Sequence, residues 1–334
     1  MKKYSFICIW LIIIVACENE IPYKLHTVSP KLTMNAMINA DSLENVLYLN
    51  FTGSASVTQV NNARVEVRIN GELKETIIPV DNPSQWSDQK LVPITTRFSA
   101  GDEVRMDAYA DDDKYHVWIE ETIPHSIDIL TVDTASVPNP YLSSAIKQLK
   151  FKVRFKDQPG KKNYYRMVLE HRHVISGKNG LDQDTAVHIK SYSLWPWDDV
   201  VLTDGQPATS EELDKELIER VANIYGVFDD GRFADNEYTM TVSSNYYISY
   251  YTNLFRPEYL NIYTAVRLLS ITESQYYYLK VLNFIDSDMV DDYLNDPVKM
   301  PGNVHNGTGF VGFSTESGRV MHVVANKKME YYEE

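Results

Sequence analysis

Apolar residues at every second position recur along most of this chain, and this pattern limits the folds open to it. They alternate with polar residues over 32–38, 65–69, 104–110 and 151–155. Because successive side chains of a strand point to opposite faces, each segment presents one apolar row and one polar row. Such segments return about every 8–15 residues, with Gly, Asp, Asn or Pro between them. The spacing predicts a mainly β protein built of half-buried strands.

The strand segments fall into two groups, which predict two domains. Those over 31–125 include an Asn70-Gly71 hairpin turn and predict an Ig-like β-sandwich of about one hundred residues. Prolines between 124 and 140 mark a connection. Residues 126–334 then predict a second β-rich, Tyr-rich domain with one or two helices.

Helical periodicity is confined to the second predicted domain. Thr272 and Gln275 have the spacing of a capping box, which predicts a helix that ends before Pro297. Ser210 is a candidate N-cap for another helix over 211–224. The apolar face of the first helix is expected to comprise residues that recur at helical spacing: Tyr278, Leu282, Ile285, Met289 and Tyr293.

The last predicted element is a hairpin close to the C-terminus. Two apolar segments, 310–313 and 320–324, flank the dipeptide Ser317-Gly318. Ser and Gly favour tight turns, so the two segments are expected to pair with each other.

The first seventeen residues have the plan of a bacterial lipoprotein signal. Two lysines precede an apolar stretch, Phe6–Val15, that is too short to span a bilayer as a helix. A small residue then precedes Cys17, as in a lipobox. We predict that residues 1–16 are removed, that Cys17 is lipidated, and that residues 17–30 form a tether. An ordinary signal peptide with an incidental cysteine is the alternative.

Lipid on Cys17 would decide where the protein lies. Two or more acyl chains hold a protein stably at a membrane, whereas one chain does so only marginally. Glu18, Asn19 and Glu20 follow the cysteine, and this acidic start resembles the surface-export signal of Bacteroidota lipoproteins. We therefore expect attachment to the outer membrane with the body facing the cell exterior. A solvated acidic tether is the alternative.

The charge balance and the cysteines exclude several classes of partner and bond. The chain has 46 acidic and 32 basic residues, a net charge of −14 that becomes −16 once the two lysines of the signal are removed. With no basic cluster to offset it, this charge repels nucleic acid, which is not an expected partner. Cys8 leaves with the signal and Cys17 is used for lipid, so packing alone must stabilise both domains.

Three glycines near the C-terminus have the spacing of a dinucleotide fingerprint. Gly307, Gly309 and Gly312 fit G-x-G-x-x-G, which needs a strand before it and a helix after it. Here a predicted strand follows the glycines. We expect them to allow positive φ or close backbone packing, and we expect no cofactor.

Histidines suggest a metal only weakly. His171 and His173 share one face of a predicted strand, and His188 is a candidate third ligand. A zinc site would require the three to converge. Exposed strand histidines are the favoured interpretation, and no metal site is predicted from them.

Carboxylates leave a calcium site open. One group lies at the end of the predicted helix and the other near the middle of the second domain. Calcium prefers such oxygen ligands, but neither spacing is that of an EF-hand loop, so solvated carboxylates are the alternative. The two groups are Asp286, Asp288, Asp291, Asp292 and Asp296, and Asp229, Asp230 and Asp235.

Aromatic residues give the best indication of binding. Seven fall within residues 246–263, and Trp195 and Trp197 flank Pro196 in a predicted loop. Tyr and Trp form large amphipathic contacts and are enriched at binding surfaces, although about half of the Tyr run should point inward. The predicted ligand or partner surface is therefore Trp195, Trp197, Tyr246 and Tyr250.

Catalysis has little support in the sequence. There is no G-x-S-x-G nucleophile elbow, and no cysteine remains free in the mature chain. A pair of carboxylates for glycoside hydrolysis stays open, because the separation of such a pair is a spatial property. The protein is predicted to be non-enzymatic, with no catalytic residue assigned.

The order of these parts resembles a family of Bacteroidota surface lipoproteins known as domain of unknown function 4249. The resemblance covers nearly the whole chain, and each matching motif is short. The matching segments are Ala100–Val104, Glu121–Pro124, Phe228–Phe233, Ser274–Leu279 and Pro301–Gly312.

This resemblance implies a neighbourhood. Members of the family commonly accompany TonB-dependent outer-membrane transporters, and none of their motifs is an established catalytic site. We therefore expect an accessory component that captures a ligand or acts as a lid for such a transporter. A structural or adhesive surface lipoprotein and a surface hydrolase are the alternatives.

Overall fold

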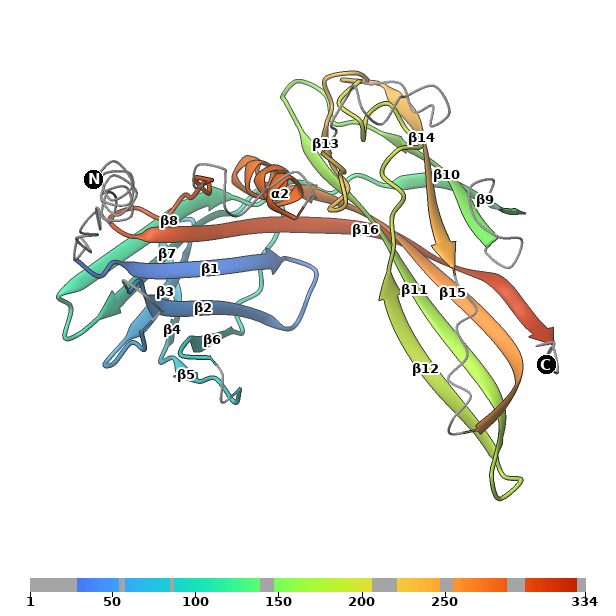
Figure 1. Cartoon of the computed structure of the whole chain (residues 1–334). Helices are drawn as coiled ribbons and strands as arrows, with labels where there is room; N and C mark the ends of the chain where they lie inside the picture. The colour runs from blue at the N-terminus through green and yellow to red at the C-terminus, as the bar shows by residue number, and fades with distance from the viewer. Residues whose placement is uncertain are drawn as a thin grey trace, which may run out of the picture.

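The computed structural model is mainly β, as predicted, with two lobes at the two ends of one long strand (Figure 1). Among the described residues, α2 (Glu273–Ile285) is the one α-helix. No described helix combines the length and apolar character that crossing a membrane requires. The structure describes residues 29–53, 58–84, 87–138, 147–205, 221–246, 255–286 and 298–328.

The N-terminal lobe is a β-sandwich. One layer is part of a nine-stranded sheet, in the order β1-β2-β6-β5, and the other is a four-stranded sheet, in the order β4-β3-β7-β8. The apolar rows predicted at 32–38, 65–69 and 104–110 meet in one buried cluster between the layers, which confirms them. The strands are β1 (Leu32–Asn39), β2 (Asn45–Phe51), β3 (Arg64–Ile69), β4 (Glu72–Ile77), β5 (Val80–Asp81), β6 (Lys90–Ile94), β7 (Glu103–Ala110) and β8 (Tyr115–Thr122).

The C-terminal lobe is a second pair of layers. The nine-stranded sheet continues here in the order β12-β11-β15-β16, with β13 paired to β11, and its inner face packs on a three-stranded sheet, β14-β10-β9. Phe151, Phe155 and Met167 are fully buried between these layers. The strands are β9 (Ile129–Pro138), β10 (Lys147–Lys156), β11 (Tyr164–Asn179), β12 (Asp184–Tyr192), β13 (Val227–Asp229), β14 (Glu237–Tyr246), β15 (Phe255–Ile271) and β16 (Thr308–Lys328).

Strand β16 belongs to both lobes (Figure 1). Its residues 308–314 pair in parallel with β1, and its residues 314–328 pair antiparallel with β15. The predicted hairpin at Ser317-Gly318 is therefore wrong, because both residues lie inside the strand, opposite Leu268 and Arg267. The two apolar segments find different partner strands, so long-range pairing overrides the local turn preference.

Helix α2 begins where predicted, but its buried face differs. Thr272 makes no side-chain cap bond, so the predicted capping box is wrong. The buried face consists of Gln275, Tyr276, Leu279 and Asn283, whereas the predicted Tyr278, Leu282 and Ile285 are half-buried. Met289 and Tyr293 lie outside the described residues. Of the other predicted helix, residues 211–220 also lie outside them, and residues 221–224 are not helical.

Asn283 explains why a polar residue faces inward on α2. Its side-chain oxygen accepts the backbone N–H of Tyr225 at 3.0 Å, and its side-chain nitrogen donates to Asn223 at 2.9 Å. Buried polar groups are tolerated when they are hydrogen-bonded in this way. The helix therefore holds the 223–225 loop against the sheet, and this loop forms one wall of the pocket described below.

Candidate functional site

Several predicted functional residues lie outside the described part of the chain. They are Cys17, with its signal and most of its tether, Tyr250, and the carboxylates Asp288, Asp291, Asp292 and Asp296. The backbone of Tyr246 is described as the end of β14, but its side chain is not. The roles assigned to these residues stay predictions.

The two predicted tryptophans lie beside the edge of the three-stranded sheet. Both Trp195 and Trp197 are half-buried. The backbone N–H of Trp195 donates to the carbonyl oxygen of Ser243 on β14 at 2.7 Å, which fixes the segment that carries both indoles. Nearby, Asp199 accepts the hydroxyl of Tyr238 at 2.7 Å. The segment after β12 is thus attached to β14 by several hydrogen bonds.

His171 is buried, so its prediction as an exposed strand histidine is wrong. Its ring is 1% exposed and lies between the two layers of the C-terminal lobe. Nδ1 lies 2.8 Å from the hydroxyl oxygen of Thr264, and Nε2 lies 2.6 Å from that of Ser244. Burial lowers the pKa of His171 to about 4, and the neighbouring His173 contributes to the same shift. The ring is therefore neutral at ordinary pH.

The three histidines do not converge. The ring centroids of His171 and His173 lie 6.3 Å apart on the inner face of β11. His188 lies opposite Val174 in the register of β11 and β12, and Val174 faces the other side of the sheet. Within the described ranges, no three His, Cys, Asp or Glu side chains are grouped as a metal site would require.

The described members of the carboxylate groups bond to the protein itself. Asp229, Asp230 and Asp235 accept the backbone N–H groups of Gly231, Asn163 and Gly160, at 3.0, 2.7 and 2.9 Å respectively. Asp286 accepts the hydroxyl of Tyr225. These hydrogen bonds hold the loops in place, and they account for where the described carboxylates lie without a calcium ion.

The glycines of the G-x-G-x-x-G spacing provide close packing, as predicted. Gly309 has a φ of +107°, and a Cβ there would lie 2.1 Å from the carbonyl oxygen of Met34 on β1. A Cβ on Gly307 would lie 2.4 Å from the carbonyl oxygen of Leu32. These glycines begin strand β16 and let it run against β1, so they have no resemblance to a dinucleotide loop in structure.

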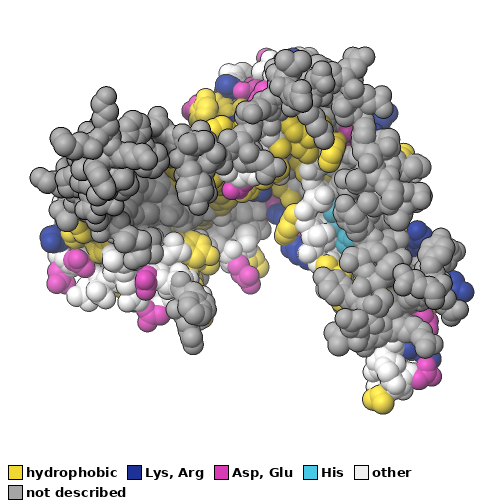
Figure 2. Space-filling model, in the orientation of Figure 1, with side chains coloured by type: hydrophobic (Ala, Val, Ile, Leu, Met, Phe, Trp, Pro, Cys, Tyr) yellow, Lys and Arg dark blue, Asp and Glu magenta, His cyan; other side chains and the backbone are white. Residues whose placement is uncertain are grey.

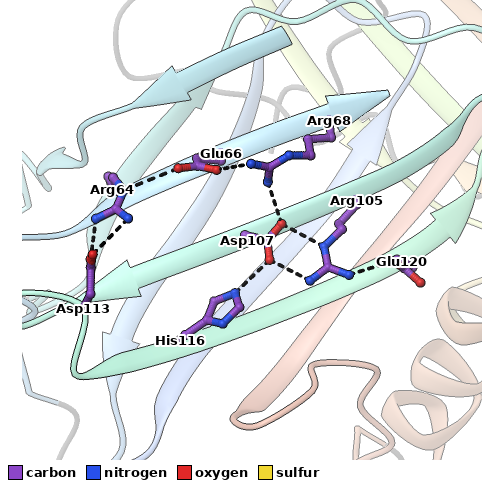
Figure 3. A network of polar contacts seen from close by, with 8 residues as sticks. All are labelled: Arg64, Glu66, Arg68, Arg105, Asp107, Asp113, His116 and Glu120. Atoms are coloured by element: carbon purple, nitrogen blue, oxygen red, sulfur yellow. Dashed lines mark hydrogen bonds and ion pairs between the residues drawn. The ribbon is translucent and has the colours of Figure 1, made fainter. Parts of the chain in front are cut away.

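A dense charged network covers the outer face of the sandwich (Figure 3). At its centre, the Asp107 carboxylate accepts hydrogen bonds from Arg68, Arg105 and His116 at 2.8–2.9 Å, and its side chain is only 2% exposed. Burial alone would raise the pKa of Asp107, but the hydrogen bonds from Arg105 and His116 outweigh it and lower the pKa. All three arginines of this network, Arg64, Arg68 and Arg105, have carboxylate partners, so the network is internally neutralised.

A pocket of about 370 Å³ lies where the two lobes meet. We call it the junction pocket. Its walls come from β1, β11, β15, β16, α2 and the loop that includes Tyr225. The polar side chains among its lining residues include Asn39, Arg166, Tyr192, Arg267 and Gln275. The pocket therefore combines side chains that are far apart in the sequence and forms only when both lobes are assembled.

Arg166 is the unusual residue of the junction pocket. It is half-buried, and its Nε donates to the carbonyl oxygen of Tyr225 at 3.0 Å. No carboxylate of the described residues lies within 4 Å of its guanidinium, unlike Arg267, which pairs with Glu316. Burial lowers the pKa of Arg166, and the like charge of Arg267 lowers it further. The pocket thus contains a positive charge that no carboxylate of the described residues neutralises.

The sheet face beyond the pocket is exposed and basic. Glu170 lies within 4 Å of Arg172, Lys190 and Arg267, so three basic groups surround one carboxylate. Exposed apolar and aromatic side chains, Tyr192, Tyr259 and Val320, lie on the same strands. Figure 2 shows hydrophobic, basic and acidic side chains around the hollow between the two lobes. This basic surface stands out in a protein with a net charge of −14.

The sequence contained only a faint sign of this pocket. Arg166 and Arg267 each interrupt an otherwise apolar strand, which is visible in the sequence. The two arginine side chains lie close together only because of the register of β11 and β15, in which Val168 is opposite Arg267. That register, and the position of the 223–225 loop, could not be read from local patterns.

Comparison with known proteins identifies a family without an assigned role. The family model described as "Domain of unknown function (DUF4249)" matches residues 18–319. No curated protein matches the chain significantly. Among solved structures, a DUF4785 family protein from Legionella pneumophila subsp. pneumophila str. Philadelphia 1 is similar, with 9% identity and a TM-score of 0.24, over 72% of this chain and 52% of that one. The chain thus spans about half the length of that protein, and the likeness carries no argument about function.

Proposed function

This chain belongs to the DUF4249 family, and we propose that it captures a ligand for a TonB-dependent transporter. In this proposal it is a non-enzymatic protein, anchored by lipid at the bacterial outer-membrane surface, and its exposed sheet face binds the ligand. The observation that carries the proposal is the face of β12-β11-β15-β16, which has the junction pocket at one end and exposed aromatic and basic side chains beyond it. This proposal extends to a Bacteroidota-type surface lipoprotein with lipid on Cys17.

The scaffold suits binding because its side chains are held on strands. β11 pairs with β15 through fifteen residue pairs and with β12 through nine. Strands hold side chains more rigidly than loops do, and a pre-organised face loses less entropy when a ligand binds. Arg and Tyr, the residue types that dominate binding surfaces, are the ones found on this face.

The arrangement gives no support to nucleophilic catalysis in the described residues. Ser244 and His171 are hydrogen-bonded, as in a Ser–His pair, but both are buried between the layers, with no route for a substrate shown. The other ring nitrogen of His171 contacts the hydroxyl of Thr264, not a carboxylate. A catalytic triad needs an accessible nucleophile and a carboxylate that orients the histidine. A binding role fits this geometry better.

The tether allows the binding face to work close to a membrane. Eleven residues separate Cys17 from Ser29, the first described residue. Fully extended, such a segment spans at most about 40 Å. A protein lipidated at Cys17 would therefore stay within about that distance of the membrane, where an outer-membrane transporter opens to the outside.

Co-purification tests the proposed function. The protein is extracted from native cells in mild detergent and captured through a C-terminal tag, and the retained proteins are identified by mass spectrometry. We expect a TonB-dependent transporter with the wild-type protein and a strongly reduced yield with Cys17→Ala. If wild-type captures contain no such transporter, the transporter role is contradicted and a structural or adhesive role is favoured.

A further inference from the structure

The junction pocket contains a positive charge, the Arg166 guanidinium, that has no carboxylate partner among the described residues. A guanidinium has five N–H donors, and Arg166 uses one of them, Nε–H, for the carbonyl oxygen of Tyr225. Removing a charge from water without a partner is costly, so buried arginines are normally paired. Within the described residues, Arg166 has no such partner, whereas Arg68, Arg105 and Arg267 do.

The surroundings of Arg166 increase this cost. The side chain next to it in the pocket is another arginine, Arg267, and the electrostatic interaction between the two is repulsive. Arg267 is attracted to Glu316 and lies 3.7 Å from Glu170, so both nearby carboxylates are already engaged. The carboxylate of Glu170 also pairs with Lys190 at 3.1 Å. No described acidic group is left over for Arg166.

A second, independent feature of the pocket points to a ligand. Gln275 lines it, and the side-chain oxygen of Gln275 is buried without a hydrogen-bond partner among the described residues. Buried acceptors are rarely left unpaired in native proteins. The pocket therefore presents a positive charge, and its wall contains a buried acceptor that no described group satisfies.

We propose that the junction pocket binds the carboxylate or phosphate group of a small anionic molecule, with the Arg166 guanidinium as its main contact. The planar fork of an arginine matches these groups with two parallel hydrogen bonds. The volume of about 370 Å³ suits a small molecule, since small-molecule sites begin near 300 Å³. The inference rests on the proposed function in that it names the class of ligand to be captured.

The test measures binding of two probes, succinate and inorganic phosphate, to the purified protein by calorimetry, with chloride at equal ionic strength as the reference. We expect saturable binding of at least one probe at one site. Arg166→Met should weaken it by at least about tenfold, because a charge-assisted pair is lost. Arg154→Gln is the matched control, since Arg154 lies on β10, outside the proposed binding face, is 49% exposed and pairs with Glu237. Its affinity should stay within about twofold of the wild type.

Stability without anion separates a ligand-binding arginine from a structural one. Removing a half-buried charge that has no described carboxylate partner should leave the unfolding temperature of Arg166→Met unchanged or raise it in anion-free buffer. A fall of several degrees would show that Arg166 supports the fold and would overturn the inference. So would failure of both probes to bind, or equal binding by Arg166→Met.

The outcome is independent of the transporter experiment. A retained transporter together with no anion binding would overturn the ligand class and leave the proposed function in place. Anion binding without a transporter would support the pocket and contradict the partner.

Discussion

Acidification should destabilise this protein through a single buried histidine. His171 is 1% exposed, and its two ring nitrogens face the hydroxyl groups of Thr264 and Ser244. Neither is a carboxylate that could stabilise an imidazolium. Burial, with a smaller contribution from His173, lowers the pKa of His171 in the folded protein from 6.5 to about 4.

The size and sign of the effect follow from the two pKa values. Between pH 6.5 and pH 4 the unfolded chain binds a proton at His171 and the folded protein does not. The stability contributed by the neutral ring is therefore complete above pH 6.5 and is lost progressively as the pH falls towards 4. At pH 5 the loss spans 1.5 pH units below 6.5, which corresponds to about 2 kcal/mol.

Urea denaturation at pH 8 and pH 5 measures this loss. Carboxylates also titrate in this range, so the quantity to compare is the difference in unfolding free energy between wild type and His171→Gln. The wild type should be more stable at pH 8, and its advantage should shrink by about 2 kcal/mol at pH 5. His188→Gln, at an exposed position on β12, should follow the wild type at both pH values. An advantage that is equal at pH 8 and pH 5 would refute the reasoning.

Two further predictions concern the sandwich. Gly309→Ala should cost roughly 2–4 kcal/mol of unfolding free energy, because the φ of Gly309 is +107° and a Cβ there would meet the Met34 carbonyl. Gly180→Ala is the control: Gly180 has open space around it, so the cost should stay within about 0.5 kcal/mol. Urea denaturation midpoints compare the two variants, and equal midpoints would contradict the β16–β1 packing. Asp107→Ala should cost about 1–3 kcal/mol, because it removes the buried acceptor that Arg68, Arg105 and His116 share. Glu120→Ala, at a 59% exposed rim position, should cost under about 0.5 kcal/mol. Thermal unfolding measures both, and similar losses would contradict a central role for Asp107.

Local features of the fold could be predicted from the sequence because they depend on neighbouring residues. The Asn70-Gly71 turn forms, with φ of 52° and 82°, because these residues tolerate the positive φ that the β3–β4 hairpin requires. The strand predicted over 151–155 lies within β10. Alternation identified the buried rows correctly wherever one face of a strand met a core.

Long-range features could not be predicted, and the functional candidates belong to this group. Ser317-Gly318 favours a turn locally. However, β1 pairs with the first half of β16 and β15 pairs with the second half, so the chain continues as one strand through these two residues. His171 reads as an exposed residue between polar neighbours, but the layer that contains Ser244 covers it. The junction pocket likewise depends on which strands meet across the two lobes, a property that no single segment carries.

Lipid on Cys17 is the claim on which location and partner depend, and metabolic labelling tests it directly. Cells that express the wild-type protein or Cys17→Ala are grown with radiolabelled palmitate, and the protein is isolated by its C-terminal tag. We predict label in the wild type, where one residue supplies the thiol, and none in the variant. Label that persists in Cys17→Ala, or a wild-type protein that never acquires it, would contradict attachment at the outer-membrane surface through this residue.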